Sequence, residues 1–181
     1  MTRLHPRLAF ATALVALAAL PACTTMGESA AAPSASAALR GADGTAHGTA
    51  RIEQTTSGLT VTLSAIAVPP GIHAVHVHTT GTCTAPDFAS AGGHWNPMGR
   101  QHGMDNPNGS HMGDMPNMTV GADGTGTLVY TIAGGTLTDG ANPLFDADGA
   151  AIVIHAKADD NVSDPAGNAG GRIACGVLAK G

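Results

Sequence analysis

One thirteen-residue segment, GIHAVHVHTTGTC at positions 71–83, constrains the fold of this chain more than any other. Side chains alternate between the two faces of a β-strand, so His76 and His78 project to one face while Val75 and Val77 project to the other. The valines predict a core beneath this strand. The two imidazoles can each donate a nitrogen lone pair and so form half of a metal site, although the pattern alone also fits a strand with histidines and no ligand.

The rest of the chain shows short β-like runs between turn residues and no helical periodicity of useful length. Turns such as Gly41–Gly44 and Asp146–Gly149 separate these runs. Besides the histidine strand, the predicted strands cover residues 37–40, 47–54, 59–63, 125–132, 151–155 and 172–178. Seven or eight short strands of this kind predict an antiparallel sandwich or barrel.

Two long segments, residues 83–119 and 157–171, have neither a strand nor a helix pattern. The first contains four potential metal ligands, which are His94, His102, His111 and Asp114. Metal ligation would order such a segment, because the binding free energy of an ion offsets the conformational entropy of the loop. Three histidines with one aspartate suit zinc. A second set, made of His76, His78 and His155, suits copper or zinc, and one further imidazole would complete the four-nitrogen environment that Cu(II) favours.

The N-terminus has the features of an export signal. Arg3 and Arg7 precede an apolar run of thirteen residues, 8–20, which is too short to span a bilayer. Leu20 to Cys23 resembles a lipoprotein processing site, so we expect residues 1–22 to be a signal peptide and Cys23 to be lipidated. Ordinary signal cleavage near Ala22 is the alternative.

We expect residues 23–36, rich in Ala, Ser, Gly and Pro, to form a flexible tether, and residues 37–181 to form the folded domain. The mature protein is predicted to lie in the periplasm or cell envelope, where disulfides are permitted. Of three cysteines, Cys83 and Cys175 can pair, which leaves Cys23 for a lipid anchor, the one membrane contact we expect. From Cys23 onward, six Lys and Arg and thirteen Asp and Glu leave a net charge of −7, which argues against nucleic acid as a partner.

Five sequence motifs in order resemble the copper/zinc superoxide dismutases, specifically the secreted bacterial kind, over about residues 37–181. The motifs are GIHAVHVH (71–78), SAGGHWNP (90–97), HMGDMPN (111–117), IVIHAKADD (152–160) and GNAGGRIACGVL (167–178). The resemblance implies an all-β fold, namely an eight-stranded antiparallel Greek-key β-barrel or sandwich with two long functional loops. It also implies copper and zinc as cofactors and superoxide as the small-molecule substrate, in a monomer or homodimer.

The resemblance also implies a role for individual residues. The implied copper ligands are His76, His78, His94 and His155, and the implied zinc ligands are His94, His102, His111 and Asp114. His94 would bridge the two metals, and Arg172 would draw the anion to the copper. Asp159 would link the two metal sites from the outer shell, His73 would be structural, and Cys83 and Cys175 would form the intrachain disulfide.

The function that these roles imply is conversion of superoxide to O₂ and hydrogen peroxide, which would protect the cell envelope from oxidative damage. The alternative is a copper-binding or storage domain of the same fold without turnover. Storage needs neither a bridging histidine nor Arg172, so the complete set favours the enzyme. A structural domain with incidental histidines is the third hypothesis.

Two features depart from the family pattern. The segment 157–171 contains Asp159, Asp160 and Asp164 but no lysine after Lys157, where family members often place cations. The segment 83–119 also contains five methionines, which are Met98, Met104, Met112, Met115 and Met118. They are predicted to fill gaps in the packing, with a soft Cu(I)-binding surface as the alternative.

Overall fold

A computed structural model describes residues 1–2 and 32–181 of the chain. The predicted signal peptide, Cys23 and most of the predicted tether therefore lie outside the described residues. Within the described part, ten strands and one short 3₁₀ helix follow one another. They are β1 (Ser34–Arg40), β2 (Ala46–Thr55), β3 (Gly58–Ala65), β4 (Gly71–His73), β5 (Val75–His78), η1 (Ala89–Ala91), β6 (Met118–Val120), β7 (Gly126–Ala133), β8 (Ala151–His155), β9 (Arg172–Val177) and β10 (Ala179–Lys180).

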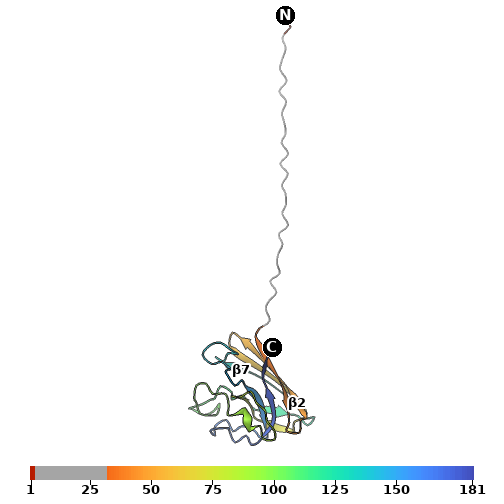
Figure 1. Ribbon diagram of the computed structural model, residues 1–181, viewed down its shortest axis with the longest axis vertical. Helices are drawn as coiled ribbons and strands as arrows, with labels where there is room; N and C mark the ends of the chain where they lie inside the picture. The colour runs from red at the N-terminus through yellow and green to blue at the C-terminus, as the bar shows by residue number, and fades with distance from the viewer. Residues whose placement is uncertain (3–31) are drawn as a thin grey trace. The chain divides into compact units, whose positions relative to one another are not determined.

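All strand pairs in the sheet are antiparallel, and the strands run in the order β4-β6-β7-β3-β2-β1-β9-β8-β5, with β10 against β1. Figure 1 shows the strands, β2 and β7 among them, gathered into one domain with long loops at one end. Strands β3 and β7 are adjacent in the sheet although they are far apart in sequence, and the same holds for β1 and β9. Greek-key crossovers require such pairs. Only Ala74 separates β4 from β5, and these two strands pair with β6 and β8 at opposite ends of the sheet. The sheet therefore nearly closes into a barrel. When β4 and β5 are counted as one strand, the barrel has the eight predicted strands and, in addition, the two-residue β10.

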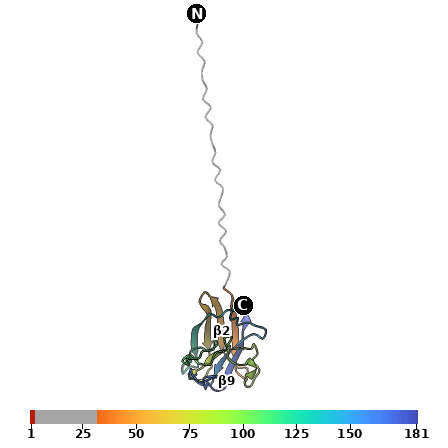
Figure 2. The ribbon, with the colours of Figure 1, turned by 90° about the vertical axis from the view of Figure 1, so that its left-hand side faces the viewer.

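The predicted all-β fold is confirmed, with small differences at the ends of the strands. β1 begins at Ser34, so Ser34 to Ser36 belong to the sheet and not to the predicted tether. β6 was missed because its three residues, Met118–Val120, are too few to show a period. The C-terminus lies beside the start of β1 (Figure 2), where the Gly181 N–H donates to the Ser34 carbonyl at 2.8 Å. No helix in the described ranges is long and apolar enough to cross a membrane.

The core lies inside the sheet and is built mainly from aliphatic side chains. Val75 and Val77 are fully buried in it, which confirms the predicted core beneath β5. Three of the five clustered methionines, Met112, Met115 and Met118, pack into the same core, while Met98 and Met104 are 49% and 40% exposed. The gap-filling interpretation is therefore confirmed for the three buried methionines.

The segment between β5 and β6 is fastened to the free edge of β5, and this attachment places the histidines. Val77 donates its N–H to the Gly113 carbonyl at 2.9 Å and accepts the Trp95 N–H at 2.8 Å. Gly113 in turn donates to the Trp95 carbonyl at 2.8 Å. A side chain at Gly113 would overlap the Val77 carbonyl, so glycine is required at this close approach. His94 precedes Trp95, and Asp114 follows Gly113. These contacts therefore bring His94 opposite His78, and Asp114 opposite His76.

Candidate metal centre

Four buried histidines from three parts of the fold converge on one point. His76 and His78 lie on β5, His155 ends β8, and His94 lies in the segment fastened to the edge of β5. One ring nitrogen from each of the four lies within 4.8 Å of those from the other three. We call these four residues the copper set, after the metal that the sequence resemblance assigns to them.

Each histidine of the copper set has one ring nitrogen hydrogen-bonded to the protein. The bonds run from His76 Nε2 to Asp159 Oδ2 at 2.7 Å, from His78 Nδ1 to the Gly92 carbonyl at 3.0 Å, from His94 Nδ1 to Asp114 Oδ1 at 2.8 Å and from His155 Nδ1 to the Gly170 carbonyl at 3.3 Å. The other nitrogen of each ring is buried and has no hydrogen-bond partner. A buried, unpaired polar atom costs about 1–3 kcal/mol. Four such lone pairs around one point therefore fit a metal cation.

A second group, which we call the zinc set, shares His94 with the first. It consists of His94, His102, His111 and Asp114, whose ligand atoms also lie within 4.8 Å of one another. Asp114 Oδ1 accepts the Nδ1–H groups of His94 at 2.8 Å and His102 at 3.0 Å, and His111 Nδ1 lies 3.4 Å from it. His94 therefore directs Nδ1 to the zinc set and Nε2 to the copper set, which is the arrangement that a bridging ligand requires.

The carboxylate of Asp159 connects the two sets. Its oxygens accept the Nε2–H groups of His76 at 2.7 Å and His102 at 2.9 Å. A side chain at Gly167 would overlap the Asp159 carboxylate. Asn117, which our sequence analysis did not single out, holds the Asp159 backbone by donating from Nδ2 to its carbonyl and accepting its N–H at Oδ1, both at 2.8 Å. Both contacts are between segments far apart in sequence, so no local signal indicates this role.

Burial favours the neutral form of three histidines in the copper set, His78, His94 and His155, and metal ligands must be neutral. Burial, with a smaller contribution from nearby histidines, lowers the pKa of His78 to about 2 and that of His155 to about 3. Burial also lowers the pKa of His94 to about 4, although Asp114 opposes the shift. For His102, burial acts in the same direction but the hydrogen bonds to Asp114 and Asp159 outweigh it and raise the pKa to about 9.

The two aspartates are held as anions. Burial acts to raise the pKa of each carboxyl, but hydrogen bonds from His102 and its neighbours hold the pKa of Asp114 and that of Asp159 well below the usual range. Asp114 Oδ2 also accepts the backbone N–H groups of Gly103 at 2.9 Å and His111 at 3.0 Å. Those bonds leave Asp114 Oδ1 directed at the zinc set.

Arg172, the first residue of β9, is oriented by two backbone carbonyls. Its Nη1 donates to the Phe88 carbonyl and its Nη2 to the Gly92 carbonyl, both at 2.6 Å. Gly92 is also the acceptor for His78, so one peptide group orients a member of the copper set and the guanidinium. The shared Gly92 carbonyl places the cation close to the copper set, and its charge contributes to lowering the pKa of both His78 and His155.

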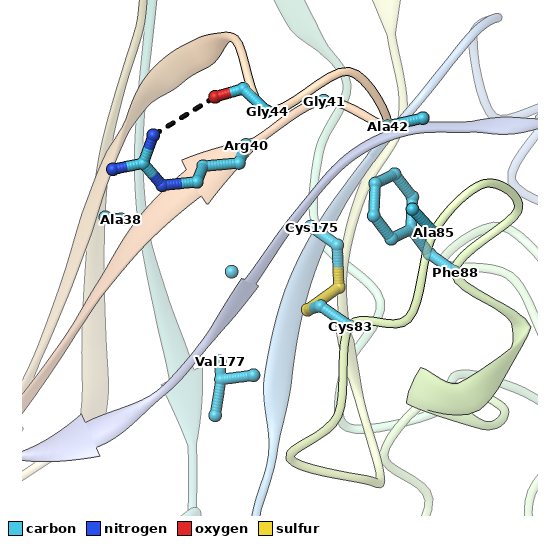
Figure 3. A pocket seen from close by; sticks show the side chains of 11 residues that line it. Ala38, Arg40, Gly41, Ala42, Gly44, Cys83, Ala85, Phe88, Cys175 and Val177 are labelled. Carbon is cyan, nitrogen blue, oxygen red and sulfur yellow. Dashed lines mark hydrogen bonds between the residues drawn. A yellow bond between two sulfur atoms is a disulfide. The ribbon is translucent and has the colours of Figure 1, made fainter.

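A disulfide between Cys83 and Cys175 ties the segment that carries Phe88 to β9, as predicted. Figure 3 shows the disulfide beside the Phe88 ring, where both line a cavity of about 500 Å³. None of the histidines lines this cavity. A smaller cavity, of about 170 Å³, is lined by His111 and Asp114 of the zinc set together with Met98 and Tyr130.

The other two histidines within the described ranges lie outside these groups. Both ring nitrogens of His73 face backbone carbonyls, those of His155 and Pro69, each at 2.8 Å, so neither nitrogen is free for a metal. His47 is only part-buried, and its Nδ1 lies 3.4 Å from the Ile66 carbonyl. Neither contact suggests a ligand role.

Comparison with known proteins agrees with this geometry. The family model for copper/zinc superoxide dismutase (SODC) matches residues 46–178. Superoxide dismutase [Cu-Zn] 2 of Aquifex aeolicus (strain VF5) is 45% identical over 146 residues, which cover 80% of this chain and 85% of that protein. The chain belongs to the copper/zinc superoxide dismutase family.

Solved structures of the family share the fold. A SOD-like protein from Bacillus subtilis superposes with a TM-score of 0.76 at 39% sequence identity, over 80% of this chain and 97% of that one. The Cu/Zn superoxide dismutase from Brucella abortus superposes with a TM-score of 0.62 at 27% identity, over 80% and 98% of the two chains. The resemblance expected from the five sequence motifs is therefore confirmed.

The lowered and raised pKa values predict how the stability of the metal-free protein depends on pH. Between pH 6.5 and about 4, the unfolded chain binds protons at His78, His94 and His155 that the folded protein does not, so the free energy of unfolding falls as the pH falls. The slope is up to about 1.4 kcal/mol per pH unit for each site. His102 has the opposite sign, because its stabilising proton is lost as the pH rises towards 9.

Urea unfolding of the metal-free protein at pH 4.5 to 9 measures this dependence. Maximal stability is expected at about pH 7, where the contribution of the three histidines with lowered pKa balances that of His102, with a steeper decline on the acid side. A curve that is flat across this range, or one with its maximum at pH 5 or below, would contradict it.

Proposed function

We propose that this protein catalyses the dismutation of superoxide, in which two superoxide anions and two protons give O₂ and hydrogen peroxide. The observation that carries the proposal is the set of four buried imidazole nitrogens without partners, one of them on His94, whose other nitrogen faces a second set of ligands. Membership of the copper/zinc superoxide dismutase family supports the same activity.

The residues divide between the two metals of the family. His76 Nδ1 and the Nε2 atoms of His78, His94 and His155 would hold copper, and the Nδ1 atoms of His94, His102 and His111 with Asp114 Oδ1 would hold zinc. Four nitrogens suit Cu(II), while three nitrogens and a carboxylate oxygen suit zinc. Bound copper supplies the one-electron redox chemistry that accepts an electron from one superoxide and returns it to a second.

The chain's own side chains supply orientation, charge and protons. Asp159 and the Gly92 and Gly170 carbonyls orient the imidazoles by accepting their distal N–H groups. Arg172 presents a planar cation to a small anion and is held in place by two carbonyls. His94 Nε2 is the atom at which the chain would hold a proton and deliver it to the departing peroxide.

We extend the proposal to where the protein works. The charged and apolar pattern of residues 1–22, followed by Cys23, supports export and attachment of the domain to a membrane through a lipid. The Cys83–Cys175 disulfide is in keeping with a compartment outside the cytoplasm. There the enzyme would remove superoxide at the cell envelope.

Metal reconstitution tests the function. Residues 34–181, purified and loaded with copper and zinc, are expected to remove superoxide rapidly, whereas the same protein with zinc alone is expected to be inactive. His78→Ala is expected to abolish copper-dependent turnover because it removes one of four copper donors. Tight binding of both metals without turnover would contradict the enzyme and leave the copper-storage alternative.

The role of Arg172 is tested by truncation. Arg172→Ala is expected to lower kcat/KM roughly tenfold or more, because a positioned cation raises the local concentration of an anionic substrate. The variant is expected to bind both metals as the wild type does. Arg51→Ala is the matched control, since this arginine lies on β2 in an exposed ion pair with Glu53. Equal rates for wild type and Arg172→Ala would contradict the role.

A further inference from the structure

The loop after β8 carries three acidic residues where the family often places cations, and only Asp159 has a role so far. Asp160 stabilises the loop itself, because its carboxylate accepts the backbone N–H groups of Val162 at 3.0 Å and Ser163 at 2.8 Å and the side-chain amide of Asn168 at 2.8 Å. Asp164 is different, since its contacts lie outside its own loop. Its side chain is 49% exposed, yet it reaches the zinc set.

Asp164 Oδ1 accepts the backbone N–H of His102 at 2.6 Å. The same oxygen lies 3.9 Å from His111 Nε2. One carboxylate oxygen therefore contacts the backbone of one histidine in the zinc set and faces the ring of another. A carboxylate acceptor makes the bond from a backbone N–H stronger than a neutral acceptor would.

The orientation of the His111 ring explains why its contact with Asp164 matters for zinc. Its Nδ1 lies 3.4 Å from both Asp114 Oδ1 and His94 Nδ1, so Nδ1 is the nitrogen that would face zinc. A neutral imidazole that donates its Nδ1 lone pair carries its proton on Nε2. Metal-bound histidines usually donate that distal N–H to a carboxylate, a carbonyl or water. Asp159 serves His102 in this way at 2.9 Å, and Asp164 is the carboxylate that faces His111.

Other contacts near His102 join the segment between β5 and β6 to the loop after β8. The Asp105 N–H donates to the Asn161 carbonyl at 2.9 Å. Asn106 Nδ2 bridges the loops through the His102 carbonyl at 2.9 Å and the Val162 carbonyl at 3.2 Å. A side chain at Gly103 would overlap the Asn161 carbonyl, so the two backbones meet closely at this point. Asp164 therefore lies in a well-defined place and not on a free surface loop.

We propose that Asp164 is a positioning residue for zinc, which fixes the His102 backbone and faces the distal N–H of His111, and thereby slows the loss of the metal. The proposal rests on the proposed function, because it takes the zinc set as the site of zinc. It also explains an acidic residue in this loop, because the negative charge of Asp164 does not attract superoxide but would stabilise bound zinc.

The test measures how fast zinc leaves the protein. Wild type and variants carrying copper and zinc are mixed with excess of a chromogenic zinc chelator, and the transfer of zinc is followed. Asp164→Ala is expected to release zinc about 10–100-fold faster, the range typical of a lost outer contact. Asp164→Asn is expected to lie between wild type and Asp164→Ala, because its amide oxygen still accepts the His102 N–H.

Asp160→Ala is the matched control, since it removes a carboxylate from the same loop without touching the zinc set. It is expected to change the rate of zinc release less than threefold. The visible spectrum of Co²⁺ bound in the zinc set gives a second measure, which is expected to change in Asp164→Ala and not in Asp160→Ala. Metal-free melting temperatures show whether either variant merely weakens the fold.

Two outcomes would overturn the proposal while leaving the function intact, namely zinc release from Asp164→Ala within threefold of wild type, or an equal effect from Asp160→Ala. A wild-type protein that binds no zinc would instead overturn the proposed function together with this inference. Rapid release from Asp164→Ala alone, with a changed Co²⁺ spectrum, would support the positioning role.

Discussion

The structure depends on burying imidazoles whose inner nitrogens have no partner in the protein. Water would satisfy these atoms at the surface, but in this structure they are buried. Four unpaired nitrogens at about 1–3 kcal/mol each are a large cost for a domain of this size. The cost is offset when a cation binds them, so the fold and the metal site are coupled through one constraint.

The same constraint explains how the long loops are arranged. The segment between β5 and β6 packs Trp95, Met112 and Met115 into the core. It is also held by the edge of β5, by the disulfide and by Asp114. Each attachment also places a functional group. The edge of β5 places His94, the disulfide holds the Phe88 carbonyl that orients Arg172, and Asp114 gathers the zinc set. The contacts that order these loops are therefore also the contacts that position the metal ligands and Arg172.

Much of this was predictable from the sequence, because strand alternation and ligand chemistry are local. His76 and His78 had to share a face, and three histidines with one aspartate in a single segment without a strand pattern indicated metal ligands. Apart from Asp159, whose role the family resemblance implied, the contacts that orient the ligands were not predictable. The Gly92 carbonyl that serves both His78 and Arg172, and the amide of Asn117 that holds Asp159, bring together residues separated by long stretches of chain. The strand β6 escaped prediction for another reason, since three residues carry no period.

We propose that His94 binds both metals at once, with Nδ1 facing the zinc set and Nε2 facing the copper set. The decisive measurement is electron paramagnetic resonance of the protein with Cu²⁺ in the copper set and Co²⁺ in the zinc set. A shared imidazole couples the two ions magnetically, so the copper signal is expected to disappear when cobalt binds and to return when zinc replaces cobalt. A full, unaltered copper signal with both sites occupied would show that His94 does not bridge them.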